Sequence, residues 1–254
     1  NTEEFNHDKT KKIFEYKNSW LKIFDYKVFY LPYFNHPDPT VKRRTGFLTP
    51  SYSSSESLGT SITIPYFRVI SKDKDMTFNP RIYADKSFLI QNEYRQALER
   101  SQIKSDFSVM IGQLGTKSHF FFNQIGKHNE YTNYELNFQT VKGDNYLKNH
   151  NLKESSDLIK DENLLLSNID INWKLEESSL DTSFKIYEDL SRNYHDRYQY
   201  IFPDFSFEKN INIPKNYNGS LIFNADGYNK NYNTNITESV LINNVLFESD
   251  NFIN

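Results

Sequence analysis

Strict alternation between apolar and polar side chains marks the stretch Ile169-Asp170-Ile171-Asn172-Trp173-Lys174-Leu175. Every second residue is large and apolar, and the residues between them are Asp, Asn and Lys. Because successive side chains of a β-strand point to opposite faces, this period of two predicts a strand with one apolar and one polar face. The pattern recurs at residues 76–84, 134–139 and 180–186, and more weakly at residues 107–111, 120–123, 217–225 and 240–247. The chain is therefore predicted to be all-β.

Turn-forming residues separate these alternating segments. They gather at residues 53–59, 71–75, 85–86, 126–130, 176–179 and 229–235. Short connections of this kind join neighbouring strands as antiparallel hairpins. Residues 142–168 are long, charged and poorly patterned, and we expect a surface loop there with a short helix around residues 155–162. One long loop among short turns fits a large antiparallel β-barrel whose two rims differ.

Composition alone does not separate a membrane barrel from a soluble protein. The mean hydropathy is −0.74, and no apolar run approaches the length of a membrane-spanning helix. A search for long apolar runs does not detect barrel strands, because these strands turn only alternate residues toward lipid. Pattern alone leaves a membrane barrel level with a soluble β-sandwich, in which the polar face meets water. Polar faces rich in Asn, Gln, Thr and Tyr, and aromatic residues at strand ends, favour the barrel.

Several function classes have no support in the sequence. A net charge of −3 gives no electrostatic reason to bind nucleic acid. The chain has no cysteine, and four of its six histidines are scattered without metal-ligand spacing: His36, His119, His128 and His195. No phosphate-binding loop, dinucleotide fingerprint or nucleophile elbow is present. We therefore expect no enzyme activity, no cofactor and no metal.

The first forty residues have shorter β segments and tighter turns than the rest of the chain. Short β segments with tight turns precede the stretch His36-Pro37-Asp38-Pro39, whose prolines cannot donate ladder hydrogen bonds. We therefore predict a domain boundary here, with one β domain in residues 1–41 and the barrel strands in residues 42–254. Since the chain has no initiator Met and ends inside an apolar-rich stretch, we also expect it to be an internal fragment of a longer protein.

A series of motifs resembles one known family. They are Tyr26-Lys27-Val28-Phe29-Tyr30-Leu31-Pro32-Tyr33-Phe34, Lys42-Arg43-Arg44-Thr45-Gly46-Phe47-Leu48-Thr49-Pro50, Ile64-Pro65-Tyr66-Phe67, Asp75-Met76-Thr77-Phe78-Asn79-Pro80-Arg81, Glu93-Tyr94-Arg95 and Tyr200-Ile201-Phe202-Pro203-Asp204-Phe205. In this order and spacing they resemble the LPS-assembly protein LptD family, also called the organic solvent tolerance protein (OstA) family. The resemblance is specific over residues 26–95 and thin beyond them.

The resemblance implies the end of a periplasmic β-jelly roll followed by part of a large transmembrane β-barrel. The implied function is transport and assembly of lipopolysaccharide into the outer leaflet of the Gram-negative cell outer membrane, without covalent chemistry. The implied partners are lipopolysaccharide, outer-membrane lipids, an LptA-like periplasmic bridge protein and an LptE-like plug lipoprotein. The N-terminal part would face the periplasm. The chain lacks the family's jelly-roll body, closing strand and disulfide cysteines.

Two other functions stay open at this point. The first is a soluble periplasmic or secreted β-sandwich that binds glycans through its aromatic residues. The second is an unrelated outer-membrane channel or receptor, which would share the barrel but not the motif series.

Pro50 and Pro65 are the most informative candidate site residues. Each interrupts a segment with strand character, and proline removes one ladder hydrogen bond. A hairpin turning near residues 57–58 would place the two prolines roughly opposite each other. The resemblance implies that they lie beside the seam where the barrel parts, and we predict that they form a lateral gate. The alternative is that each proline only marks a strand end or a bulge.

Two further candidate sites lie near the domain boundary. Alternate residues of the first motif would form a path for acyl chains on one strand face, although ordinary core packing explains each residue equally well: Val28, Tyr30, Pro32 and Phe34. The basic residues Lys42, Arg43 and Arg44 precede Gly46. Arg and Lys bind phosphate well, but a solvated hinge between the domains is the favoured interpretation.

Strand alternation also predicts which residues face lipid. We expect four side chains to point outward: Ile171, Trp173, Phe184 and Ile186. We expect four others to point inward: Asp170, Asn172, Ser183 and Lys185. The pair Glu93 and Arg95 is expected to form part of a charge network inside the barrel.

Overall fold

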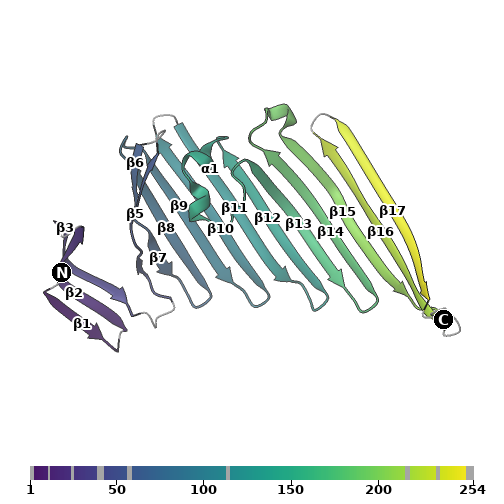
Figure 1. Ribbon diagram of the computed structural model, residues 1–254, viewed down its shortest axis with the longest axis horizontal. Coiled ribbons are helices and arrows are strands. Elements are labelled where there is room, and N and C mark those ends of the chain that lie inside the picture. Colours follow the sequence, from purple (N-terminus) through teal and green to yellow (C-terminus); the bar gives the residue numbers. More distant parts are fainter. Residues whose placement is uncertain are drawn as a thin grey trace, which may run out of the picture.

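The computed structural model describes residues 3–10, 12–23, 26–38, 43–55, 59–112, 115–214, 218–232 and 235–249. These residues form two antiparallel β-sheets with a few short helical turns (Figure 1). The prediction of an all-β fold is therefore confirmed. None of the helices in these ranges is long and apolar enough to cross a membrane.

The first sheet is a three-stranded meander at the N-terminus. Its strands are β1 (Glu4–Asp8), β2 (Ile13–Ile23) and β3 (Tyr26–Pro37). Aromatic side chains pack across the strands: the Phe5 and Phe14 ring centroids are 5.6 Å apart, and those of Tyr16 and Phe34 are 5.9 Å apart. Cross-strand pairs of this kind stabilise a sheet by roughly 0.2–1 kcal/mol each.

The second sheet has 14 strands and carries most of the chain. Its strands are β4 (Gly46–Phe47), β5 (Ser51–Ser55), β6 (Gly59–Thr63), β7 (Tyr66–Val69), β8 (Lys74–Tyr83), β9 (Phe88–Ala97), β10 (Ser101–Gly112), β11 (Gly115–Lys127), β12 (Thr132–Lys142), β13 (Leu164–Lys174), β14 (Ser178–Asp189), β15 (Tyr198–Ile211), β16 (Gly219–Tyr232) and β17 (Ile236–Ser249). From β8 to β17 each strand pairs with its sequence neighbours, as in an up-and-down barrel wall. Across the described strands, the sheet runs from β5 to β17 without pairing between these two edges.

The strand register sorts the side chains of the second sheet onto two faces. Residues paired across antiparallel strands share a face. Ile169 pairs with Phe184, and the next residue, Asp170, pairs with Ser183. Following the register across the sheet gives an apolar face that includes Phe78, Ile90, Phe107, Phe120, Phe138, Ile169, Phe184, Phe205 and Phe223. The polar face includes Thr77, Gln91, Asp106, His119, Asn137, Asp170, Ser183, Asp204 and Asp226.

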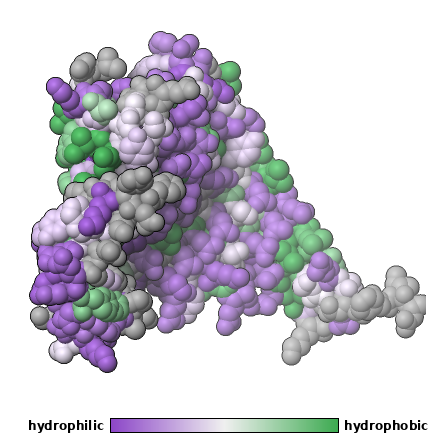
Figure 2. Space-filling model, turned by 60° about the vertical axis from the view of Figure 1, so that its left-hand side comes forward, coloured by the Kyte–Doolittle hydropathy of each residue, from purple (hydrophilic) through white to green (hydrophobic). Residues whose placement is uncertain are grey.

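The two predicted sets of residues fall on opposite faces. Ile171, Trp173, Phe184 and Ile186 lie on the apolar face, and Asp170, Asn172, Ser183 and Lys185 lie on the polar face. Large apolar side chains remain open to the surroundings: Ile169 is 45% exposed and Phe184 is 40% exposed. Hydrophilic residues dominate the hollowed side of the molecule in Figure 2. The sheet thus has an exposed apolar face and a hollow polar face.

Residues 143–163, here called the inner segment, connect β12 to β13 and fold against the polar face (Figure 1). They contain α1 (Tyr146–Asn149) and the 3₁₀ turn η1 (Leu152–Ser155); a second 3₁₀ turn, η2 (Tyr194–Asp196), precedes β15. Ten buried residues form the main hydrophobic cluster between the inner segment and the sheet: Tyr83, Leu89, Met110, Phe121, Tyr146, Leu147, Leu152, Ile159, Leu165 and Leu190. The core of the chain therefore lies on the polar side of the sheet.

Two expectations for this connection are wrong. The predicted helix around residues 155–162 is absent, and the helical turns lie earlier, within residues 146–155. The connection is also not a solvated surface loop, because Tyr146, Leu147 and Leu152 are fully buried. Burial of these apolar side chains against the sheet determines where the turns form, which the charged character of the stretch did not indicate.

Candidate functional site

Pro50 and Pro65 lie where the first hairpin of the second sheet is interrupted. Above them β5 and β6 pair from Ser51 and Thr63 to the end of the strands, and below them Phe47 of β4 pairs with Tyr66 of β7. Between these two ladders the register shifts by one residue. The Leu48 N–H donates to the Pro65 carbonyl at 2.9 Å in this gap. The two prolines therefore flank the junction between two halves of one hairpin.

Strand β8 supports both halves of this hairpin. Its upper part pairs with β6 and its lower part with β7. At the junction, the Ile64 N–H donates to the Pro80 carbonyl at 3.2 Å. The edge formed by β4 and β5 is held by two residue pairs below the prolines and five above them. The interruption thus weakens the edge of the sheet while the neighbouring strand continues.

Arg43 joins the segment before β4 to the polar face of the sheet. Its guanidinium lies 2.6 Å from the Asp75 carboxylate and donates to the Lys72 carbonyl at 2.7 Å. Asp75 is buried and also binds Arg95 at 2.8 Å, while Arg95 lies 3.4 Å from Glu93. Glu93 and Arg95 therefore share a charge network on the polar face, as expected. Through Asp75 of β8 and Arg95 of β9, this network links Arg43 to the second sheet.

The other residues of the basic cluster are placed less fully. Arg44 is half-buried just before β4, and Gly46 pairs with Phe67 with open space around its Cα. Lys42 lies outside the described residues. Of this cluster, Arg43 is the residue whose side-chain contacts the structure describes, with Asp75 and the Lys72 carbonyl.

The candidate acyl-chain residues lie along β3 of the first sheet. Tyr30 and Phe34 are each 42% exposed, and Pro32 between them is also exposed. The Tyr30 ring packs 5.0 Å from Trp20 on β2, and its hydroxyl donates to Asn18. The backbone of Val28 belongs to β3, but its side chain lies outside the described part of the chain. The three described residues alternate along one open strand face.

A buried polar cluster beneath α1 was missed from the sequence. Asp106 and Ser108 of β10 and His119 of β11 share the polar face, and all three are almost completely buried. The Ser108 hydroxyl lies 2.6 Å from His119 Nδ1 and 2.6 Å from the Tyr146 hydroxyl. The Asp106 carboxylate accepts from Gln91 at 3.0 Å and lies 3.3 Å from His119 Nε2 without hydrogen-bond geometry. A Ser-His-Asp grouping sealed under α1 has no access for a substrate, so it serves to hold the inner segment.

A second polar contact holds the end of α1. The Tyr83 hydroxyl lies 2.5 Å from His150 Nδ1, and Arg81 donates to the His150 carbonyl. Burial, with the nearby Arg81 charge, lowers the pKa of His150 to about 4, and burial raises the pKa of Tyr146 to about 12. Both side chains are therefore neutral near pH 7, which suits their enclosed position.

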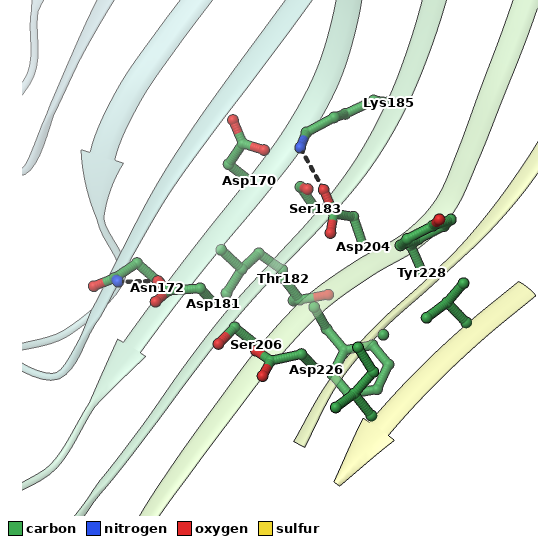
Figure 3. Close-up of a pocket in the computed structure, with 15 residues that line it drawn as sticks. Asp170, Asn172, Asp181, Thr182, Ser183, Lys185, Asp204, Ser206, Asp226 and Tyr228 are labelled. Carbon is green, nitrogen blue, oxygen red and sulfur yellow. Dashed lines mark hydrogen bonds and ion pairs between the residues drawn. The ribbon is translucent and has the colours of Figure 1, made fainter. Parts of the chain in front are cut away.

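An open pocket of about 510 Å³ lies on the polar face between β13 and β17 (Figure 3). Its polar lining includes four carboxylates and one ammonium group, from Asp170, Asp181, Asp204, Asp226 and Lys185. Lys185 donates to Asp204 at 2.7 Å, and Asn172 donates to Asp181. Among the described residues no group of three or more His, Cys, Asp or Glu side chains is arranged to hold a metal ion. The arrangement forms a polar, net acidic surface.

A scan of the chain against protein-family models found no match. A search of curated proteins found relatives that match parts of it. The LPS-assembly protein LptD of Pseudoalteromonas translucida (strain TAC 125) is 32% identical over 137 residues, covering 51% of this chain and 18% of that protein. The LPS-assembly protein LptD of Shewanella sp. (strain MR-4) is 36% identical over 85 residues, covering 34% of this chain and 11% of that protein.

A third relative, the LPS-assembly protein LptD of Pseudomonas aeruginosa (strain UCBPP-PA14), is 33% identical over 85 residues, covering 34% of this chain and 9% of that protein. The chain thus spans less than a fifth of the length of these relatives. All three carry the name of the family that the motif series resembles. These matches, which reach over about half of this chain, support its identification as part of an LptD-family protein.

Proposed function

We propose that this chain is part of a transmembrane β-barrel that transports lipopolysaccharide and assembles it into the outer leaflet of the Gram-negative outer membrane, without covalent chemistry. The observation that carries the proposal is the two-faced second sheet. Its long strands have 10–14 residues, and a tilted strand needs about 9–11 residues to cross a bilayer. The exposed apolar face suits lipid, and the hollow polar face suits a hydrated lumen. A soluble β-sandwich would bury the apolar face against another sheet.

The lengths of the connections support an orientation in the membrane. At the end of the sheet where β4 begins, the connections from β7 onward are residues 70–73, 98–100, 128–131, 175–177 and 212–218. At the opposite end they are residues 84–87, 113–114, 143–163, 190–197 and 233–235, and the two longest connections of the sheet lie at this end. Outer-membrane barrels have short periplasmic turns and longer extracellular loops. We therefore assign the end at β4 to the periplasm and the end at the inner segment to the cell exterior.

This orientation gives the two sheets separate roles. Residues 1–41 would be the last strands of a periplasmic jelly roll, and residues 42–254 the first part of the barrel. The open face at Tyr30, Pro32 and Phe34, together with the predicted fourth residue Val28, would carry acyl chains arriving from an LptA-like bridge protein. An LptE-like lipoprotein would plug the barrel on the polar side. Arg43 would fix the hinge between the two parts through Asp75.

The interrupted hairpin is the proposed lateral gate. Pro50 and Pro65 cannot donate ladder hydrogen bonds, and they flank the register shift between the two hairpin halves. An edge of this kind separates from its neighbour at lower cost than a continuous ladder. The lipid would leave the barrel sideways beside this edge.

Depleting the protein is expected to stop delivery of lipopolysaccharide to the cell surface, and the complete wild-type gene is expected to restore it. The Pro50→Ala/Pro65→Ala variant should restore it less well, because each regained ladder bond contributes about 0.5–1.5 kcal/mol. One such bond shifts a two-state gate severalfold to about tenfold, since 1.4 kcal/mol is a factor of ten. Surface lipopolysaccharide and sensitivity to large antibiotics are the measurements.

Pro214→Ala, after the end of β15 and outside the described ladders, is the control for this experiment. It should behave as wild type, and each single gate variant should show a milder defect than the double variant. Unchanged surface delivery of lipopolysaccharide in the double variant, with new hydrogen-exchange protection at both alanines, would show that the prolines only mark strand ends or bulges. Normal surface delivery in depleted cells would instead refute the transport function itself.

A further inference from the structure

A groove crosses the apolar face where β12 and β13 separate. Their ladder runs from Thr132 and Trp173 to Asn137 and Asn168, and the described pairing ends there. Above this level the strands part and leave an open groove of about 710 Å³. This volume is within the range of roughly 300–1,000 Å³ that small-molecule sites have.

The groove is lined by large apolar side chains and has a small residue, Ser167, at its base. Its outward-facing lining consists of Phe122, Leu136, Phe138, Ile169, Phe184, Ile186 and Phe202, with Ser167 at the centre. The other residues of β13 on this face are large: Ile169, Ile171 and Trp173. Ser167 lies opposite Ile186 of β14. The small side chain at position 167, among large neighbours, opens the groove. No charged side chain lines it.

The polar atoms at the floor are already bonded within the protein. The Gln139 N–H donates to Ser167 Oγ at 3.0 Å, and the Leu166 N–H donates to Gln139 Oε1 at 2.9 Å. The Leu166 carbonyl accepts from the Asn137 amide at 2.9 Å. These side chains replace the missing ladder, so the separated strands need no partner from outside. A ligand of this groove therefore gains from apolar contact and not from hydrogen bonds.

A cation lies at the outer end of the same face. Lys142 is the last residue of β12 and shares the apolar face with Phe138, as the pairing of β11 with β12 shows. The two residues are four positions apart, which is about 13 Å along a strand. The Lys142 side chain is exposed, and an ammonium group attracts phosphate. The groove and this cation together suit an acyl chain whose anionic headgroup lies toward the cell exterior.

We propose that the groove binds one acyl chain of a lipopolysaccharide molecule resident in the outer leaflet, with a headgroup phosphate near Lys142. The proposal rests on the proposed function, which places the apolar face in the membrane and this end of β12 on the outer side. The site lies on β11 to β15, away from the hairpin of β4 to β7. It is therefore a binding site on the outer wall, separate from the route of the transported lipid.

Filling the groove tests the proposal. Ile186→Trp places a large ring beside Ser167, and Leu180→Trp places the same ring on the same strand and face, outside the groove lining. Each variant is expressed from the complete gene and purified from outer membranes in mild detergent. Native mass spectrometry then counts the lipopolysaccharide retained per protein. Ile186→Trp should retain severalfold less than wild type, Leu180→Trp should match wild type, and Lys142→Gln should lie between them.

Equal lipopolysaccharide retention by all variants would overturn the proposal, as would retained phospholipid in place of lipopolysaccharide. If Ile186→Trp fails to insert, Lys142→Gln decides, and unchanged retention in that variant counts against the site. Surface delivery is measured in the same cells. Failure of the wild-type gene to deliver lipopolysaccharide would refute the transport function, whereas normal delivery with unaltered retention would refute only the groove.

Discussion

Phe184→Arg is expected to destabilise the folded protein in a bilayer by about 2–4 kcal/mol, the cost of a cation on the lipid face at mid-membrane. Phe184 is near the middle of β14, on the apolar face, and pairs with Ile169. The neighbouring Ser183→Arg should cost much less. Its side chain enters the polar pocket of about 510 Å³, where Asp170 and Asp204 offer carboxylates. The difference between adjacent positions arises because successive side chains face lipid and water.

Urea titration of the full-length protein in lipid vesicles measures this difference. The two variants add the same side chain to the same strand, so helix or strand propensity and expression effects largely cancel between them. Equal loss of stability at positions 183 and 184 would contradict a membrane-facing apolar side. A larger loss at Ser183 would reverse the assignment of the two faces.

Either Asp106→Leu or His119→Leu is expected to lower the free energy of unfolding by about 1–3 kcal/mol, since each change removes a hydrogen-bond partner from a buried polar group. Both side chains are fully buried beneath α1 and lie 3.3 Å apart. Without Asp106, the Gln91 amide loses its acceptor, and without His119, Ser108 loses one partner. Release of the inner segment from the sheet should accompany the loss.

The double variant Asp106→Leu/His119→Leu should be less destabilised than the sum of the single variants, because either single variant already releases the inner segment and lets water reach the remaining polar groups. Hydrogen exchange and limited proteolysis across residues 143–163 report release of the inner segment, and urea unfolding reports overall stability. Additive losses, or single variants with a fully protected segment, would show that this pair does not hold the inner segment.

The faces of the long strands were predictable because they depend on local geometry. Alternation in residues 169–175 fixes which side chains share a face, whatever the partner strand, and the observed register of β13 and β14 agrees. Turn residues at 71–75 and 176–179 also coincide with connections between strands. Neither inference required knowledge of contacts distant in sequence.

The inner segment was not predictable, because its stability comes from distant partners. Tyr146 contacts Ser108 across 38 positions, and His150 contacts Tyr83 across 67 positions. Charged residues around 155–162 favoured a solvated helix, whereas burial of Leu147 and Leu152 determines the observed turns. The spacing of Asp106 and Ser108 showed that they share a face, but only the register brings His119 to them.

The geometry around Pro50, Pro65 and Arg43 was predictable in part. A proline marks an interrupted ladder from sequence alone, so the placement of Pro50 and Pro65 near one level of a hairpin could be inferred. The one-residue register shift between the two halves could not, because it depends on how both strands pair. Likewise, the basic character of Arg43 was evident, but its partner Asp75 lies 32 positions away.

Cysteine labelling along β13 tests the central claim most directly, since the chain has no cysteine of its own. Single cysteines at Asp170 and Asn172 on the polar face are compared with cysteines at Ile169 and Ile171 on the apolar face, in outer membranes and with a water-soluble maleimide. Mass spectrometry of the peptides from this chain counts the label. We expect rapid labelling at positions 170 and 172 and protection at 169 and 171. Equal labelling at all four positions would contradict a wall with one face in lipid and the other in water.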